Sequence, residues 1–173
     1  MQYELRKYED SDYEFVYEVK KLCYQKYVDE YYGGWVEKTQ REMFAKLMVQ
    51  DAAHSYIILV SGERVGFFSE GENSSDCYRP NNICLKPDFR GKGIGTDILT
   101  KAIEKHKSQD IVLRCFKSNP AQNLYKRLGF VVFDETQSHF LFVKKYKKYG
   151  QTKPEINLTS MIDVMCILMS VFM

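Results

Sequence analysis

Short hydrophobic runs, each bounded by polar or turn-forming residues, predict the strands of this protein. The run "SYIILV" is followed by the turn "SGER" and then by "VGFFSE", a succession that indicates a hairpin. Near the end of the domain, "FVVF" and "HFLFV" indicate a second hairpin. The predicted strands cover residues 1–8, 55–60, 65–70, 81–86, 111–116, 130–133 and 139–143.

Hydrophobic residues spaced three and four positions apart predict four helices. The first two, residues 10–31 and 36–48, are separated by the break "GGW". A third helix covers residues 94–106. The fourth has clear end signals, because Asn119 suits the N-cap and Gly129 suits the left-handed residue after the last turn.

The predicted elements follow the order β-α-α-β-β-β-α-β-α-β-β. Helices and strands that alternate in this way indicate an α/β protein with a mixed sheet and helices on both faces. A chain of 173 residues is long enough for one such domain with a full hydrophobic core.

Composition and charge narrow the classes of function. A net charge of +2 argues against a nucleic-acid-binding protein, which is normally far more basic. Five cysteines without a CxxC pair, and an N-terminus without signal-peptide features, favour free thiols and a cytoplasmic location. The three histidines are scattered along the chain, so no metal site is expected.

The stretch "FRGKGIGTDILTKAI", residues 89–103, places three glycines within five residues directly before a predicted helix. A Walker A loop is excluded because Gly93 follows Lys92, and the dinucleotide fingerprint is excluded because position 96 is Thr. Bare amides at a helix start, with Arg90 and Lys92 beside them, favour an anion. A plain glycine-rich turn between strand and helix stays open as the alternative.

Two motifs in register carry a family resemblance. "ICLKPDFRGKGIGTDIL" resembles motif A of the GNAT superfamily of N-acetyltransferases, and "NPAQNLYKRLGF" (119–130) is similar to the second signature of that superfamily. One predicted strand lies between them, as the family requires. The resemblance covers about residues 1–147. It implies an α+β fold with a mixed, mostly antiparallel central sheet and helices on both faces.

The resemblance also implies a co-substrate, acetyl-CoA, and residues that bind it. The loop amides would hold the pyrophosphate, and the strand before Pro87 would pair through its backbone with the pantetheine arm. The cofactor-binding residues expected in this way are Ile83, Leu85, Arg90, Gly91, Lys92, Gly93, Ile94, Gly95, Thr96 and Asn119. Asn119 could instead be an ordinary helix cap.

The reaction implied by the resemblance is direct attack of an amine on the thioester. Tyr125 matches the tyrosine of the family that acts as general acid towards the departing thiolate, although a tyrosine packed in the core is the alternative. Many family members carry a carboxylate on the strand before Pro87 as general base, but residues 77–86 contain none. Glu70 and Glu72 are the nearest candidates, and both could simply be solvated hairpin carboxylates. Cys84 is expected to be a small buried hydrophobic residue.

The acceptor is expected to bind near the first two helices. Eight of the thirteen tyrosines lie in the first 32 residues, and the only tryptophan follows at position 35. Tyr27, Tyr31 and Trp35, with Asp29 and Glu30 nearby, could bind a cationic amine through ring faces and charge. Packing of the helices against the sheet is the alternative. The sequence does not identify the primary amine, which could belong to a small molecule, a peptide or a protein, and it leaves a monomer or a homodimer open.

The end of the chain has a different character. Residues 148–157 are expected to be a basic and polar linker, and residues 158–173 a hydrophobic helix. The stretch 154–173 resembles the first membrane segment of the ExbD/TolR biopolymer-transport proteins, including an aspartate at position 163. A helix over 158–173 would reach about 24 Å at ~1.5 Å per residue, which is short of a ~30 Å hydrocarbon core. A fused or truncated segment with at most weak membrane contact is therefore expected, and a helix docked on the domain or on a partner is the alternative.

Three hypotheses follow from these patterns. The first is an acetyl-CoA-dependent N-acetyltransferase, from the two motifs in register. The second is a non-catalytic acyl-CoA-binding module, because the strand carboxylate is missing. The third is a membrane-associated transport subunit, which rests on the C-terminal segment alone.

Overall fold

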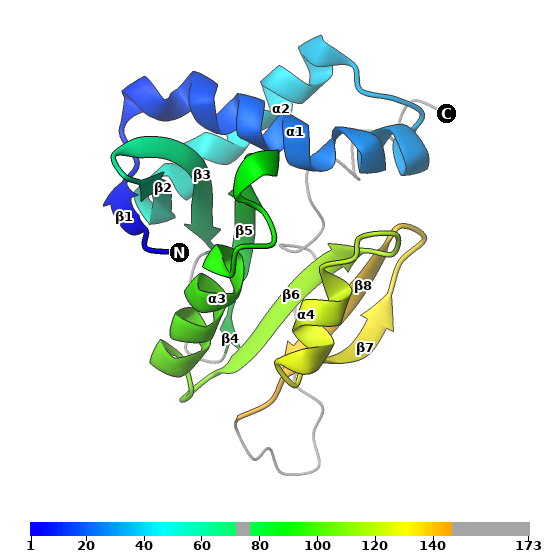
Figure 1. Cartoon of the computed structure of the whole chain (residues 1–173). Helices are drawn as coiled ribbons and strands as arrows, with labels where there is room; N and C mark the ends of the chain where they lie inside the picture. The colour runs from blue at the N-terminus through cyan, green and yellow to red at the C-terminus, as the bar shows by residue number, and fades with distance from the viewer. Residues whose placement is uncertain (72–76, 147–173) are drawn as a thin grey trace.

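The computed structural model describes residues 1–71 and 77–146 of the chain. In this part, two four-stranded sheets are present (Figure 1). The first sheet has the strand order β1 (Glu4–Lys7), β2 (Ser55–Val60), β3 (Glu63–Glu70) and β5 (Pro80–Leu85). The second has the order β4 (Cys77–Tyr78), β6 (Asp110–Phe116), β8 (His139–Lys144) and β7 (Val131–Glu135).

The helices occupy the connections between these strands. The α-helices are α1 (Tyr13–Tyr32), α2 (Glu37–Asp51), α3 (Ile94–Lys105) and α4 (Gln122–Arg127). Short 3-10 turns are η1 (Asp10–Asp12), η2 (Ala52–His54) and η3 (Pro87–Phe89). The observed order reproduces the predicted one, with strand β4 as an addition.

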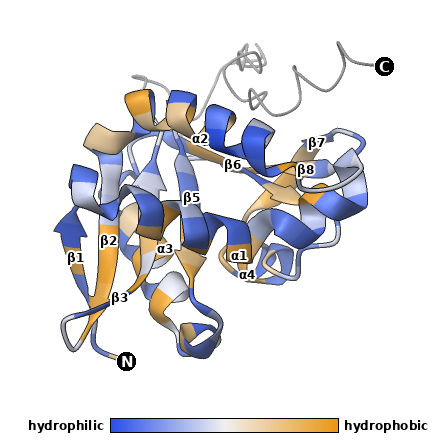
Figure 2. Cartoon of the chain, turned by 90° about the horizontal axis from the view of Figure 1, so that it is seen from above, coloured by the Kyte–Doolittle hydropathy of each residue, from blue (hydrophilic) through white to orange (hydrophobic). Residues whose placement is uncertain are grey.

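Helices cover both faces of the first sheet. Successive residues of a strand point to opposite faces, and Ile57 and Ile58 of β2 are both fully buried. Ile57 packs in a cluster with Phe44 and other residues of α1 and α2, whereas Ile58 packs with Ile94 and Ile98 of α3. Figure 2 shows hydrophobic colour along β2 and β3, and hydrophilic and hydrophobic colours alternating along the helices. The expected α+β fold with a mixed, mostly antiparallel arrangement is confirmed.

The single central sheet of the prediction is divided in the structure, because β5 pairs with β3 but not with β6. Instead, β4 begins the second sheet by pairing in parallel with the first residues of β6. Figure 1 shows β5 and β6 diverging from this point towards α1. We call the region where they are furthest apart, below α1, the open end of the sheets.

The hydrogen-bond pattern of β5 determines which residues face this open end. The amide of Lys86 donates to the Val65 carbonyl (2.8 Å), so the backbone of Lys86 faces β3. In an antiparallel pair successive residues alternate in direction, and no irregularity interrupts this part of the ladder. The backbone groups of Ile83 and Leu85 therefore point away from β3, towards the open end.

Several expectations fall on residues that the structure does not describe. Glu72, the linker 148–157 and the helix 158–173 all lie outside the described residues, so they stay predictions. None of the helices within residues 1–71 and 77–146 is long and apolar enough to cross a membrane. In the same part of the chain, His, Cys, Asp and Glu form no group of three that could hold a metal ion.

Candidate active site

The glycine loop of residues 91–95 leads directly into α3. Gly91 and Gly93 have φ values of 70° and 85°, in the left-handed region that favours glycine, and a Cβ built on either would meet no atom within 4 Å. Ile94 is buried and anchors the start of α3. A Cβ on Gly95 would lie 3.5 Å from Cγ2 of Ile83, so this part of the loop lies beside β5. The loop thus presents bare backbone to open space next to the open end of the sheets.

The first turn of α3 has the properties of an anion site. The amide of Asp97 donates to the Gly93 carbonyl (2.9 Å), which closes the first helical turn. The amides before it, those of Ile94, Gly95 and Thr96, precede the helical ladder and carry the positive end of the helix dipole. Lys92 adds a charge at the loop, where its Nζ lies 5.4 Å from the centre of the Phe89 ring.

Arg90 does not extend towards the loop in this structure. Its Nε donates to the Leu85 carbonyl (2.8 Å), and its Nη2 donates to the Leu22 carbonyl (3.5 Å) and to Sγ of Cys23 (3.4 Å). The guanidinium therefore joins the end of β5 to α1. The contact of Arg90 with a pyrophosphate stays a prediction.

Tyr125 lies on α4 and packs against the core cluster that includes Phe130 and Phe142. Its ring packs edge-on against Phe130 (6.1 Å between centres) and Phe142 (5.6 Å). Burial raises the pKa of Tyr125 far above its usual range, and Cys115 on β6, Cys84 on β5 and Tyr27 on α1 raise it further. The phenol is therefore near residues of all three elements, and it keeps its proton at neutral pH.

Asn119 caps the turn that leads into α4. Its Oδ1 accepts a hydrogen bond from the amide of Ala121 (2.9 Å), and the α-helix itself begins three residues after Asn119, at Gln122. Gly129 has the predicted left-handed conformation, with φ of 85°. The predicted cap is present, although it acts on the turn before the helix.

The aromatic residues expected at the acceptor site serve packing roles in this structure. Tyr27 is buried and stacks on Phe116 of β6 (4.9 Å), and Tyr31 stacks on the same ring (5.8 Å). Nε1 of Trp35 donates to Glu37 (3.1 Å), and the backbone amide of Trp35 donates to Asp29 (2.8 Å). The alternative of helix packing accounts for these contacts.

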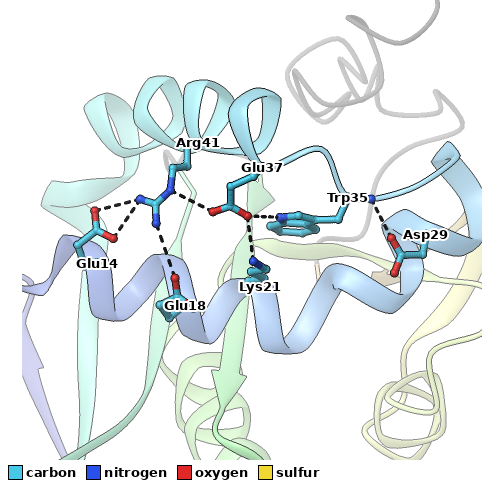
Figure 3. Close-up of polar contacts among 7 residues, drawn as sticks. All are labelled: Glu14, Glu18, Lys21, Asp29, Trp35, Glu37 and Arg41. Atoms are coloured by element: carbon cyan, nitrogen blue, oxygen red, sulfur yellow. Dashed lines mark hydrogen bonds and ion pairs between the residues drawn. The ribbon is translucent and has the colours of Figure 1, made fainter.

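Ion pairs join α1 to α2 along their outer side (Figure 3). Arg41 of α2 contacts Glu14 (3.0 Å) and Glu18 (3.7 Å) of α1, and also Glu37 of its own helix (3.0 Å). A hydrogen bond from Lys21 is the main cause that lowers the pKa of Glu37 to about 2. A carboxylate with so low a pKa is a poor proton acceptor, so Glu37 is not suited to be a general base.

Glu70 is buried rather than solvated. The hydroxyl of Tyr78 donates a hydrogen bond to its Oε1 (2.6 Å), and the hydrogen bond adds to burial in raising the pKa of Tyr78. Glu70 pairs with Pro80 at the beginning of β5. Cys84, near Tyr125, lies four residues further along that strand, about 13 Å away at ~3.3 Å per residue. This position does not favour direct proton transfer between Glu70 and a group held beside Tyr125.

The sequence pattern did not reveal a group of polar side chains beneath α1. The hydroxyl of Tyr24 donates to Oδ1 of Asn82 (3.0 Å), and Nδ2 of Asn82 donates to Oγ of Ser69 (2.8 Å). Cys23 and Cys84 meet beside them. Tyr24 and Asn82 are 58 positions apart, and no local motif signals that they touch.

Comparisons with known proteins agree with this architecture. Residues 51–132 match the model of the GNAT acetyltransferase domain. An uncharacterised N-acetyltransferase of Methanocaldococcus jannaschii is 29% identical over 153 residues, a match that spans 83% of this chain and 67% of that protein. A Bacillus subtilis protein provisionally named as a ribosomal protein bS18 alanine N-acetyltransferase is 28% identical over 123 residues, spanning 69% of this chain and 74% of its own.

Solved structures give the same result for the fold. The PaiA N-acetyltransferase of Thermoplasma acidophilum, crystallised in complex with coenzyme A, has a TM-score of 0.64 at 22% identity, with 84% of this chain and 100% of that chain covered. At this identity the likeness concerns the fold alone. Residues 51–132 are thus similar to a GNAT acetyltransferase domain, and this match and the two relatives named as N-acetyltransferases support an acyltransferase.

Proposed function

We propose that the protein is an acetyl-CoA-dependent N-acetyltransferase that transfers the acetyl group directly to a primary amine. One observation carries the proposal: the bare glycine loop at the start of α3 lies beside β5, whose backbone at Ile83 and Leu85 faces away from β3. The complex of the Thermoplasma acidophilum structure with coenzyme A supports the choice of acyl donor.

The pyrophosphate of the donor is assigned to the loop. The amides of Ile94, Gly95 and Thr96 would donate to it, and Lys92 would add a charge. The pantetheine arm is assigned to the edge of β5, where the backbone of Ile83 points away from β3. Arg90 would act indirectly, because its bond to the Leu85 carbonyl fixes the end of β5 relative to the loop.

Tyr125 is assigned the role of general acid. The neutral amine forms a bond to the thioester carbon, and the carbon–sulfur bond breaks with its electron pair on sulfur. A thiolate with a pKa near ~8.5 can then take the phenolic proton through a short hydrogen bond, and the proton that the acylated nitrogen loses returns through solvent to the phenolate, which restores Tyr125. Because burial raises the pKa of Tyr125, the phenol stays protonated over the whole neutral range, but it is also a weaker acid towards the thiolate than an exposed tyrosine.

The ammonium proton of the acceptor must be lost before attack. Glu37 is a poor base and Glu70 lies towards the opposite end of β5. We therefore assign this proton to solvent water, with the neutral fraction of the amine as the reacting species. The acceptor itself is proposed only as a primary amine of a small molecule, a peptide or a protein.

The test uses the full chain, acetyl-CoA and a panel of amines, with coenzyme A release measured by chromatography. The panel includes a polyamine, free amino acids, a lysine peptide and, because of the name of the Bacillus subtilis relative, a peptide with an N-terminal alanine. We expect release with at least one amine. Absence of release with every amine, together with no acetyl-CoA binding by calorimetry, would overturn the proposal.

The role of Tyr125 is tested by Tyr125→Phe. We expect kcat to fall by about 10²-fold, because the variant removes the proton donor and keeps the ring. The Michaelis constant for acetyl-CoA should change little. Tyr56→Phe is the matched control, since Tyr56 is another half-buried tyrosine, stacked on Phe68 in the core of the first sheet. Equal kcat values for the two variants would exclude Tyr125 as general acid.

A further inference from the structure

Two cysteines from distant parts of the chain meet at the open end of the sheets. Cys23 lies on α1 and Cys84 on β5, both are free thiols, and they pack in one hydrophobic cluster. Sγ of Cys23 lies 3.7 Å from the Leu85 carbonyl, directly after Cys84 in the chain, and each of the two cysteines shifts the pKa of the other. Cys84 is only 1% exposed, whereas Cys23 is partly exposed. The pair therefore has one thiol that solvent can reach and one that it cannot.

The positively charged guanidinium of Arg90 lies beside Cys23, the thiol that solvent can reach. Nη2 of Arg90 lies 3.4 Å from Sγ of Cys23, and Nε of the same guanidinium is held by the Leu85 carbonyl at 2.8 Å. Arginine stays charged at any pH that the protein meets. Partly exposed cysteines beside such a charge are the ones that react as thiolates.

The pKa values of the two thiols also indicate that Cys23 is the reactive one. The hydrogen bond from Cys84 and the charge of Arg90 lower the pKa of Cys23 to about 7, against the opposing effect of burial. Burial raises the pKa of Cys84, and the neighbouring Cys23 raises it further. Cys23 thus loses its proton first, while Cys84 remains a thiol.

We propose that Cys23 and Cys84 form a hydroperoxide-reactive pair, with Cys23 as the attacking thiolate and Cys84 as the resolving thiol. The Cys23 thiolate attacks the outer oxygen of a hydroperoxide; the oxygen–oxygen bond breaks, and an alkoxide or hydroxide leaves. The product is a sulfenic acid on Cys23. The Cys84 sulfur then attacks the Cys23 sulfur, which forms the disulfide and releases water. Two electrons pass from the two thiols to one hydroperoxide.

A disulfide between Cys23 and Cys84 would link α1 covalently to β5. α1 and β5 already meet through the hydrogen bond between Tyr24 and Asn82, so the covalent bond would link elements that are in contact. Oxidation would also remove the thiolate that faces Arg90. On the proposed function, the end of β5 contacts the acyl donor, so the oxidised protein should bind acetyl-CoA with altered affinity.

The experiment treats the full chain with hydrogen peroxide, alkylates the remaining thiols after denaturation, and maps the peptides by mass spectrometry. We expect a cross-linked peptide pair containing Cys23 and Cys84, lighter by two hydrogens and restored by dithiothreitol. In Cys84→Ser, Cys23 should stop at the sulfenic acid, which dimedone traps. Cys77→Ser is the matched control and should give the same disulfide as the unaltered protein.

A second measurement needs no variant. Burial raises the pKa of Cys77, which is also partly exposed, so Cys77 is an internal comparison. At pH 7, native-state alkylation by iodoacetamide should modify Cys23 about tenfold faster than Cys77, or more. Equal rates, or peroxide oxidation of Cys23 without the disulfide, would overturn the proposal. Both readouts are chemical and use no acetyl-CoA, so they are independent of the test of acetyl transfer.

Discussion

At the scale of single residues, Gly93 determines what can approach the start of α3. Its φ of 85° is costly for any residue with a Cβ, by about 1–2 kcal/mol, and the space beside it is open. Gly62, in the turn between β2 and β3, has nearly the same conformation, with φ of 79° and equally open space. The two glycines therefore differ in position and not in strain.

This pair gives a test of the loop. Gly93→Ala and Gly62→Ala should lower the free energy of unfolding by similar amounts, about 1–2 kcal/mol, measured in urea. Only Gly93→Ala should weaken acetyl-CoA binding, by about tenfold, because its methyl group intrudes where the pyrophosphate is proposed to lie. Calorimetry measures both affinities. If the two variants bind acetyl-CoA equally well, the loop does not hold the donor.

The sequence predicts best those residues whose role depends on the conformation of their own backbone. Gly129 was expected to be left-handed from its place after a helix, and its φ is 85°. The binding of the pyrophosphate by Arg90 stays a prediction, whereas its contacts with Leu22 and Cys23, almost 70 positions away, were not predicted. Glu70 was considered either a candidate base or a solvated carboxylate, yet it is buried and accepts a hydrogen bond from Tyr78. Such side-chain contacts depend on the tertiary fold, which no local pattern contains.

At the scale of elements, Asp12 of η1 connects β1 to β3. Its buried carboxylate accepts two hydrogen bonds from Arg6 (2.8 and 3.0 Å), one from Arg64 (3.1 Å) and one from the amide of Glu9 (3.0 Å). Burial alone would raise the pKa of Asp12, but these bonds outweigh it and lower the pKa below the usual range. The folded state therefore favours the ionised carboxylate.

The sign of the pH dependence follows from this lowered pKa. The stabilisation from Asp12 is complete above the pKa of the unfolded chain, near ~3.9, and is lost as the pH falls below that value towards the lowered pKa of the folded state. Asp12→Asn should cost about 2 kcal/mol at pH 7 and much less at pH 3, as measured by urea unfolding. Asp134→Asn, on the exposed strand β7, should change stability little at either pH. A loss that is the same at pH 7 and pH 3 would contradict the assigned role.

Most elements could be predicted because each has its own period and end signals, and β2 was predicted over the residues that it occupies. Strand β4 was missed since two residues, Cys77 and Tyr78, show no period, and their partners Asp110 and Ile111 lie more than thirty positions away. The division of the sheet was missed for a related reason. The division depends on which edge of β5 stays unpaired, and the pattern of hydrophobic residues does not indicate which edge that is.

At the scale of the whole molecule, α1 holds the two sheets in their diverging arrangement. The middle of this helix contacts β5 through Tyr24 and Asn82, and its C-terminal half packs on Phe116 at the end of β6. The Phe116 ring also lies against His139 of β8 (4.0 Å between centres). Phe116 is therefore the aromatic contact between α1 and the second sheet, beside the hydrogen bonds of Tyr32 with Ser138 (2.7 Å) and of Ser118 with Glu30 (2.6 Å).

Phe116→Ala should test this attachment. Removing a buried phenylalanine costs about 3–5 kcal/mol, and we expect hydrogen exchange to show the largest loss of protection in residues 27–32 of α1. Protection in β2 and β3 should decrease less, because the first sheet keeps its own cluster. Phe133→Ala is the control, since Phe133 is 37% exposed on β7 and its removal leaves no cavity. Equal loss of protection in α1 and in the first sheet would mean that Phe116 stabilises the domain as a whole, without a specific role in attaching α1. If residues 27–32 lose protection selectively, acetyl transfer should fall as well, because the proposed site needs α1 above the open end of the sheets.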